Sequence, residues 1–267
     1  MDLVGKTSPS EEDLKLLEEF FEDTKVNEIE LYLDTESLEE ENAIPNLLES
    51  EFDVASVHIP HVSPSGDYEH EWDNYIERAA GIANFYDAPL VFHSQFMQLA
   101  HKTNAWYSDR TLEDMAEELP CEVLYENNPE TGAGGIDQFI KKRGDSLALD
   151  TAHLYCGCND PYTDRDAYDV MEDLLGDNEL DVGLIHLTDA ISGDREEGPQ
   201  DGVTFDEGDS DLEDMAYIIE ESDYEGKVVM EVDPLSDEQR RLYDKLQELE
   251  ASDYGISRRE QMKASIN

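Results

Sequence analysis

The sequence alternates eight times between a short apolar run and a longer amphipathic segment. The apolar runs are rich in branched and aromatic residues, which is typical of buried β-strands. The predicted strands cover residues 2–6, 28–33, 54–59, 89–93, 122–126, 146–150, 182–187 and 227–232. This regular alternation favours a parallel sheet with a helix after each strand.

The amphipathic segments between these runs predict the helices. They cover residues 10–23, 36–50, 71–86, 108–119, 135–144, 164–176, 209–222 and 236–251. Several begin with Ser, Asp or Thr, which are good helix N-caps. Eight strand–helix units in about 250 residues predict a single-domain (β/α)8 barrel over residues 1–267, with a C-terminal helix and a short polar tail at about 252–267.

An open doubly wound sheet is the alternative fold for such an alternation. It usually carries a glycine-rich phosphate loop after its first strand. The sequence at this point, "GKTSPSEE", is not such a loop. We therefore expect the barrel.

The chain is strongly acidic, with 68 Asp and Glu against 18 Lys and Arg and a formal net charge of -50. Such a charge can indicate disorder. Here, however, the acidic residues are dispersed between apolar segments, as on haloarchaeal proteins, where high salt screens their repulsion. We expect a folded, halophilic protein and interpret the charge as a sign of environment and not of function.

The cysteines and the apolar runs indicate the compartment. Three cysteines (Cys121, Cys156 and Cys158) form no disulfide framework, and the N-terminus lacks the pattern of a secretory signal. No apolar run approaches the roughly 18 residues of a membrane span. We expect a cytoplasmic protein without membrane contact, in which Cys156 and Cys158 are buried thiols and not a soft-metal site.

Six consecutive predicted strands end with a nitrogen or oxygen donor. These residues are His58, His93, Glu126, Asp150, His186 and Glu231. The carboxyl ends of parallel barrel strands meet at one mouth, where active sites lie, and His153 follows shortly after Asp150. Burying several carboxylates there is costly unless they are paired or bind metal. The set predicts a divalent metal site for Zn²⁺, Mn²⁺, Co²⁺ or Mg²⁺.

Two loops near the predicted mouth add candidates for substrate binding. Lys102 and Arg195, after the fourth and seventh strands, could hold a phosphate or a sugar acid, and Trp106 could stack on a sugar or a flipped base. The compact basic group at 141–143 is expected near the bottom of the barrel. The sequence therefore lacks a clear basic patch for nucleic acid.

The segments "SVHIPH", "LVFHSQ", "LYENNP", "LALDTAHLY", "IHLTDA" and "VVMEVDP" together resemble the xylose isomerase-like barrel superfamily over roughly residues 50–235. This superfamily contains sugar isomerases and epimerases and the endonuclease IV type of abasic-site nuclease, AP endonuclease family 2. For an epimerase, the resemblance implies one divalent metal held by Glu126, Asp150, His186 and Glu231. The two glutamates would exchange a proton through a metal-stabilised enediolate, and His153 would bind substrate.

For a nuclease, the resemblance implies that Glu126 bridges two zinc ions. His58 and His93 would complete one site, and Asp150, His186 and Glu231 the other. A third zinc ion would need His153 and an Asp-x-His pair after the seventh strand, but no histidine follows His186 in this sequence. The nucleases' N-terminal Gly-x-His-x-Ser motif is missing as well.

Our leading expectation is a metal-dependent sugar or sugar-phosphate isomerase or epimerase, with Mn or Zn favoured. Glu126, Glu231 and His153 are its expected catalytic residues, and a small sugar or sugar phosphate its partner. The alternative is an abasic-site endonuclease or other phosphodiesterase, in which His58 and His93 bind a second metal instead of substrate hydroxyls. A sugar-binding protein without turnover is a third possibility. About one ion per chain indicates epimerisation, and two indicate hydrolysis.

Overall fold

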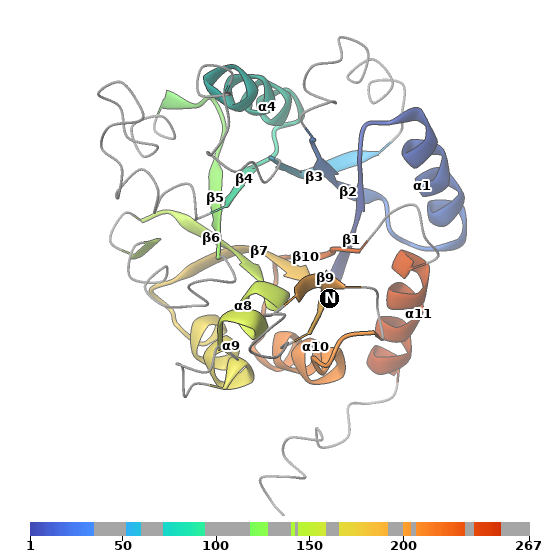
Figure 1. The fold of residues 1–267 in the computed structure, drawn as a ribbon, viewed down its shortest axis with the longest axis vertical. Coiled ribbons are helices and arrows are strands. Elements are labelled where there is room, and N and C mark those ends of the chain that lie inside the picture. Colours follow the sequence, from blue (N-terminus) through green and yellow to red (C-terminus); the bar gives the residue numbers. More distant parts are fainter. Residues whose placement is uncertain are drawn as a thin grey trace, which may run out of the picture.

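A computed structural model of the chain describes residues 1–34, 52–59, 72–93, 118–127, 140–141, 144–158, 166–191, 200–203, 207–232 and 238–251. Within these ranges, eight parallel strands close into a barrel in the order β1-β10-β7-β6-β5-β4-β3-β2 (Figure 1). The strands are β1 (Asp2–Thr7), β2 (Glu28–Tyr32), β3 (Asp53–His58), β4 (Leu90–His93), β5 (Val123–Glu126), β6 (Ser146–Asp150), β7 (Asp181–Leu187) and β10 (Lys227–Met230). The predicted (β/α)8 barrel is confirmed, and its strands lie where the apolar runs predicted them.

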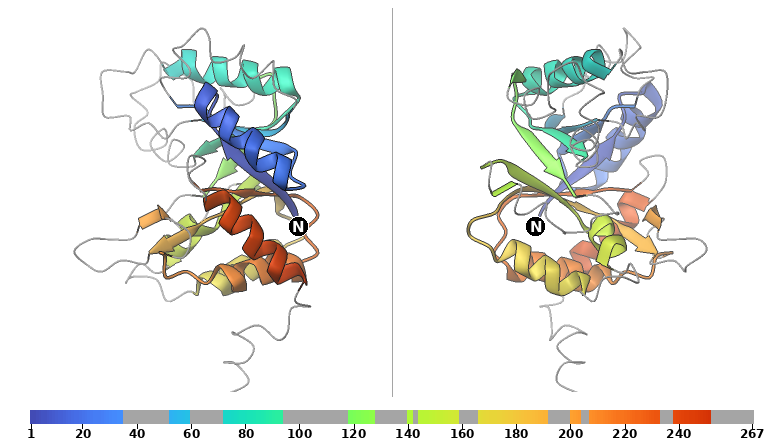
Figure 2. Two further views of the ribbon diagram at one scale, coloured as in Figure 1. Left: turned by 90° about the vertical axis from the view of Figure 1, so that its right-hand side faces the viewer. Right: turned by 60° about the vertical axis from the view of Figure 1, so that its left-hand side comes forward.

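Helices surround the barrel, as the two further views in Figure 2 show. They are α1 (Glu11–Asp23), α4 (Trp72–Tyr86), α9 (Ala167–Leu175), α10 (Leu212–Glu221) and α11 (Glu238–Ala251). The side chains of Ser10, Asp166 and Asp211 accept hydrogen bonds from the first turns of α1, α9 and α10, so these helices begin at side-chain caps. The predicted helix at 36–50, most of those at 108–119 and 135–144, and the tail at 252–267 lie outside the described residues.

An apolar layer inside the barrel lies beneath the donor residues. It consists of Val4, Ala55, Val91, Leu124, Ala148, Leu184 and Val229, all buried. Successive side chains of a strand point to opposite faces, so the residue two positions further along points into the barrel one layer higher. In β4, β5, β6 and β7 and at the end of β10, that residue is one of the predicted donors. The strand period thus places polar groups directly above an apolar floor.

Two structural features after β6 and β7 were not predicted from the sequence. Helix α8 (Thr151–Cys158) begins directly after β6, because Asp150 Oδ1 accepts a hydrogen bond from the backbone N–H of His153 at 2.6 Å, as an N-cap does. A two-stranded antiparallel sheet of β8 (Asp189–Ile191) and β9 (Gln200–Val203) follows β7. The carboxylate of Asp189, in β8, accepts hydrogen bonds from Gly208 N and Ser210 Oγ and so ties β8 to the segment before α10.

The three cysteines are free, Cys156 and Cys158 being buried and Cys121 half-buried. This agrees with the predicted buried thiols. Among the described residues, no helix is long and apolar enough to cross a membrane.

Candidate metal centre

The six donor residues of the strand ends converge in three overlapping groups. The first group consists of His58, His93 and Glu126, and the second of Glu126, Asp150, His186 and Glu231. The third combines His58 of the first group with His186 and Glu231 of the second. Within each group, one possible ligand atom per residue lies within 4.8 Å of all the others. Strand pairing produces this arrangement, because His93 is the parallel-strand partner of Glu126, and Asp150 that of His186.

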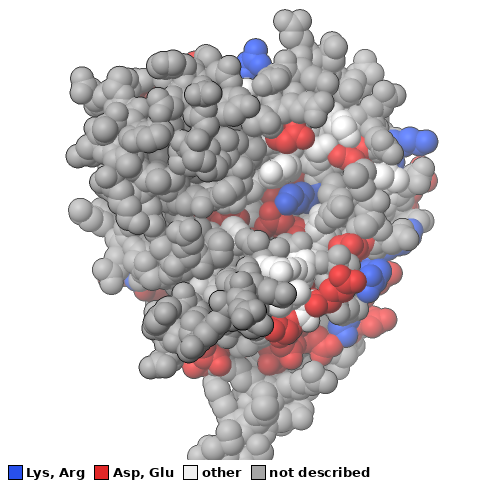
Figure 3. Space-filling model, in the orientation of Figure 1, with Lys and Arg blue, Asp and Glu red and all other residues white. Residues whose placement is uncertain are grey.

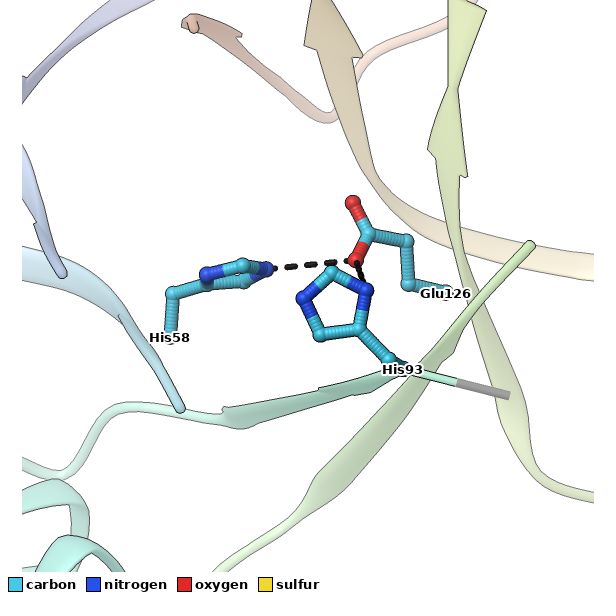
Figure 4. A group of neighbouring side chains, drawn as sticks. All are labelled: His58, His93 and Glu126. Atoms are coloured by element: carbon cyan, nitrogen blue, oxygen red, sulfur yellow. Dashed lines mark hydrogen bonds and ion pairs between the residues drawn. The ribbon is translucent and has the colours of Figure 1, made fainter. Parts of the chain in front are cut away.

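Glu126 belongs to the first and the second group, and its two carboxylate oxygens face different partners. Oε2 lies 3.2 Å from His58 Nε2 and 2.9 Å from His93 Nδ1 (Figure 4). Oε1 lies 2.6 Å from His186 Nδ1. Burial would raise the pKa of Glu126, but the three histidines outweigh it and hold this pKa well below its usual value. The two oxygens of this buried carboxylate thus face imidazoles on opposite sides.

Asp150 and His186 show how strongly acidic groups crowd the second group. Burial, together with the charges of Glu231 and Glu126, raises the pKa of Asp150 well above its usual value, although His153 opposes this shift. Burial would lower the pKa of His186, but the carboxylates of Glu30, Glu231 and Glu126 raise it well above its usual value. The side-chain amide of Asn127 fixes the backbone of Asp150 by pairing with both its N–H and its C=O.

The donors fit divalent cations. They are imidazole nitrogens and carboxylate oxygens without a thiolate, which suits zinc or manganese at a reactive site. His58 Nδ1 is buried without a hydrogen-bond partner, and Glu231 Oε2 lies 3.1 Å from His186 Nδ1 without hydrogen-bond geometry. Like-charged carboxylates so close together repel one another unless cations lie between them.

His153 lies beside the centre but in none of the donor groups. Its Nδ1 is 2.7 Å from the backbone oxygen of Asn127, and its ring centroid is 6.1 Å from that of His93. This position is compatible with the expected role in substrate binding. The other expected substrate contacts, Trp106, Lys102 and Arg195, lie outside the described residues. Lys141, from the basic group at 141–143, forms an ion pair with Asp177, which precedes β7 at the opposite end of the barrel.

Three charged or aromatic residues near the centre were not predicted from the sequence. Lys6 Nζ lies 2.6 Å from Glu231 Oε1, and Glu30 Oε2 lies 2.9 Å from His186 Nε2. The ring of Tyr32 lies 5.0 Å from Lys6 Nζ and stacks on that of His58. A signal was present in the sequence, because Glu30 interrupts a buried apolar strand in the phase that points into the barrel.

No protein-family model matches the sequence, and no curated protein is significantly similar to it. Solved structures share its fold. The TTHB071 protein from Thermus thermophilus, soaked with ZnCl2, has a TM-score of 0.61 at 18% identity, covering 94% of this chain and 99% of that one. A D-tagatose 3-epimerase-like protein has a TM-score of 0.61 at 16% identity, covering 96% of this chain and 100% of that one. An AP endonuclease, family 2, from Brucella melitensis has a TM-score of 0.56 at 15% identity, covering 90% of this chain and 96% of that one. These neighbours, together with a xylose isomerase domain protein from Alicyclobacillus acidocaldarius, show that the chain shares its barrel fold with sugar epimerase-like, xylose isomerase domain and AP endonuclease family 2 proteins.

Proposed function

We propose that the protein is a hydrolase of phosphate esters, of the phosphodiesterase class, whose centre would hold two divalent cations with Glu126 as a ligand common to both. The observation that carries this proposal is the division of the Glu126 carboxylate between His58 and His93 on Oε2 and His186 on Oε1. Centres with two closely spaced cations are common in phosphatases and nucleases. The geometry therefore favours hydrolysis over the isomerisation or epimerisation that the sequence led us to expect.

Different residues of the chain would hold the two cations of such a centre. His58 and His93 would hold one cation, and Asp150, His186 and Glu231 the other. When bound, the cations would activate a water nucleophile and neutralise charge on the phosphate oxygens.

The electrostatics of the centre support this division. Burial opposes ionisation of Glu231, but Lys6 and His186 outweigh it and hold its pKa well below its usual value. The pKa of Glu126 is also low. Both carboxylates are therefore ionised at neutral pH, as metal ligands must be.

An isomerase or epimerase is the second candidate. Glu126, Asp150, His186 and Glu231 complete a one-cation group by themselves, and this group contains two glutamates. In that reaction, Glu126 and Glu231 would exchange the substrate proton, and His153 would bind the sugar. A D-tagatose 3-epimerase-like protein among the structural neighbours makes this candidate worth testing.

Within the phosphodiesterase class, the charges beside the centre favour a small phosphate ester over nucleic acid. The acidic excess on the described part of the face in Figure 3 does not decide this, because it runs through the whole sequence and reflects the environment. Nucleic-acid affinity depends on several Lys and Arg contacts to phosphates. Lys6, the cation that the described residues bring to the centre, is held by Glu231. We therefore propose a small phosphate ester as the substrate and zinc or manganese as the metal.

The test combines metal content with paired assays in molar KCl. We expect about two ions per chain by elemental analysis, as a two-metal centre requires. We also expect hydrolysis of bis(p-nitrophenyl) phosphate that stops with chelator and returns with zinc or manganese. An abasic-site oligonucleotide and a panel of ketoses are assayed in parallel. One ion per chain together with ketose epimerisation would transfer the assignment to the second candidate.

A matched pair of variants makes the assay specific. His93→Asn removes a donor of the first group only. Glu122→Gln removes a carboxylate just before the same strand as Glu126, outside the donor groups. Hydrolysis should be lost in the first variant and kept in the second. Hydrolysis that survives in His93→Asn would contradict the two-cation reaction.

A further inference from the structure

Strands β1 and β2 contribute no residue to the donor groups of the described chain, yet each carries a charged side chain toward the centre. These side chains are Lys6 and Glu30. Glu30 is fully buried, at 0% exposure, between Ile29 and Leu31 of the outer core. Burying a carboxylate costs several kcal/mol unless it is well paired. Barrel closure does not require a charge at this position, so the contacts of the Glu30 carboxylate indicate its role.

The contacts of Glu30 all lead to the centre. Oε2 lies 2.9 Å from His186 Nε2 and accepts a hydrogen bond of 2.8 Å from Ser56 Oγ. Oε1 is buried without a hydrogen-bond partner. The pairing of β2 with β3 places Ser56 directly beside Glu30. The hydroxyl thereby fixes the carboxylate oxygen that faces the imidazole.

The two nitrogens of His186 consequently have different surroundings. Nε2 faces Glu30, whereas Nδ1 faces Glu126 and Glu231 at 2.6 and 3.1 Å. A carboxylate only accepts hydrogen bonds, so Nε2 must carry a hydrogen in this contact. Without a cation, Nδ1 likewise donates to Glu126, at 2.6 Å. A cation held by the carboxylates of the centre would take the place of this hydrogen on Nδ1, while Nε2 keeps its own toward Glu30.

We propose that Glu30 is a positioning residue of the metal centre: it accepts the Nε2 hydrogen of His186 and so fixes Nδ1 as the metal-binding nitrogen. This inference rests on the proposed function insofar as the centre must bind a divalent cation. Glu30 itself touches no cation in this arrangement. Outer carboxylates of this kind typically strengthen metal binding by about 10- to 100-fold.

The experiment separates the hydrogen bond of Glu30 from its charge. Zinc affinity is measured by chelator competition for the wild type, Glu30→Gln and Glu30→Leu. Gln removes the charge but keeps a carbonyl oxygen that can accept from Nε2, whereas Leu removes both. We expect a loss of about 10- to 100-fold for Leu and a clearly smaller loss for Gln. Equal losses for Gln and Leu would mean that charge alone acts, and would overturn the positioning role.

Glu28→Gln is the matched control, because Glu28 lies two residues earlier on β2 and pairs with Lys227 at the other end of the barrel. It should bind zinc as the wild type does. If Glu30→Leu does not fold, ¹⁵N NMR of the zinc-loaded wild type decides: a hydrogen on Nε2 of His186 supports the role, and a hydrogen on Nδ1 overturns it. A wild type that binds no zinc refutes the proposed function, whereas wild-type affinity in Glu30→Leu refutes the positioning role alone.

Discussion

Replacing Glu126 by Gln should remove both cations at once. The substitution keeps the shape of the side chain but removes the charge that the first and second donor groups share. His93→Asn and Asp150→Asn each change a residue of one group only. We therefore expect about two ions per chain in the wild type, about one in either single-group variant, and close to none in Glu126→Gln.

The expected stability changes follow from mass action. At a free cation concentration about a thousand times the Kd, one bound ion stabilises the fold by about 4 kcal/mol. Unfolding entropy is about 2.1 cal/mol/K per residue, or about 0.6 kcal/mol/K for the 267 residues of this chain. Each ion should then raise Tm by about 7 °C, and two ions by about 14 °C. Glu126→Gln should lose nearly all of this increase and each single-group variant about half.

The assay is thermal unfolding of each protein with excess zinc and with chelator, together with its metal content. The difference in Tm between the two conditions is compared among variants, so that direct effects of a substitution on the metal-free fold largely cancel. A Glu126→Gln variant that keeps one tightly bound ion and half of the Tm increase would refute the bridging role. The two groups would then bind cations independently.

Four further predictions follow, two on proton binding, one on the Lys6 ion pair and one on salt. Because the pKa values of Asp150 and His186 are raised, cations must displace protons from both side chains. Zinc affinity, measured by chelator competition, should therefore increase with pH, and a pH-independent affinity would contradict this. The metal-free protein should instead lose stability as pH rises above about 6.5, the ordinary pKa of histidine, because folded His186 keeps a proton that the unfolded chain releases. Lys6→Met should destabilise the metal-free protein by about 1–3 kcal/mol in urea unfolding, because Glu231 loses the ammonium group with which it pairs. The metal-loaded protein should lose less stability, and equal losses would argue against Glu231 as a metal ligand. With a net charge of -50, Tm should rise steeply with KCl concentration, and a flat response would count against halophilic adaptation.

Much of the donor set follows from the strand period. Val91, Leu124, Ala148 and Leu184 lie in the apolar layer, and each precedes by two positions a donor that shares its face. Parallel strands in a closed barrel bring those ends to one mouth. The positions of His93, Glu126, Asp150 and His186 could therefore be read along the chain without knowing any contact.

Helix α8 and the pair β8–β9 could not be predicted in the same way. The stretch from Thr151 to Cys158 has hardly any amphipathic pattern, because nearly all of it is buried. Its start depends on Asp150, which is a candidate metal ligand at the end of its strand and also accepts a hydrogen bond from the backbone N–H of His153. A carboxylate with two roles has no distinct signature in a pattern of apolar and polar residues.

The sequence by itself determined the barrel, because strand and helix periods are local properties, and it determined which residues stand at the strand ends. Only the tertiary structure decided how these residues share partners. The contact of Glu30 with His186 joins residues 156 positions apart, and that of Lys6 with Glu231 joins residues 225 apart. Both depend on the closure of β1 against β10 and on the register of neighbouring strands. The division of the Glu126 oxygens between two groups has the same origin, since it is set by the distances across the barrel and not by spacing along the chain.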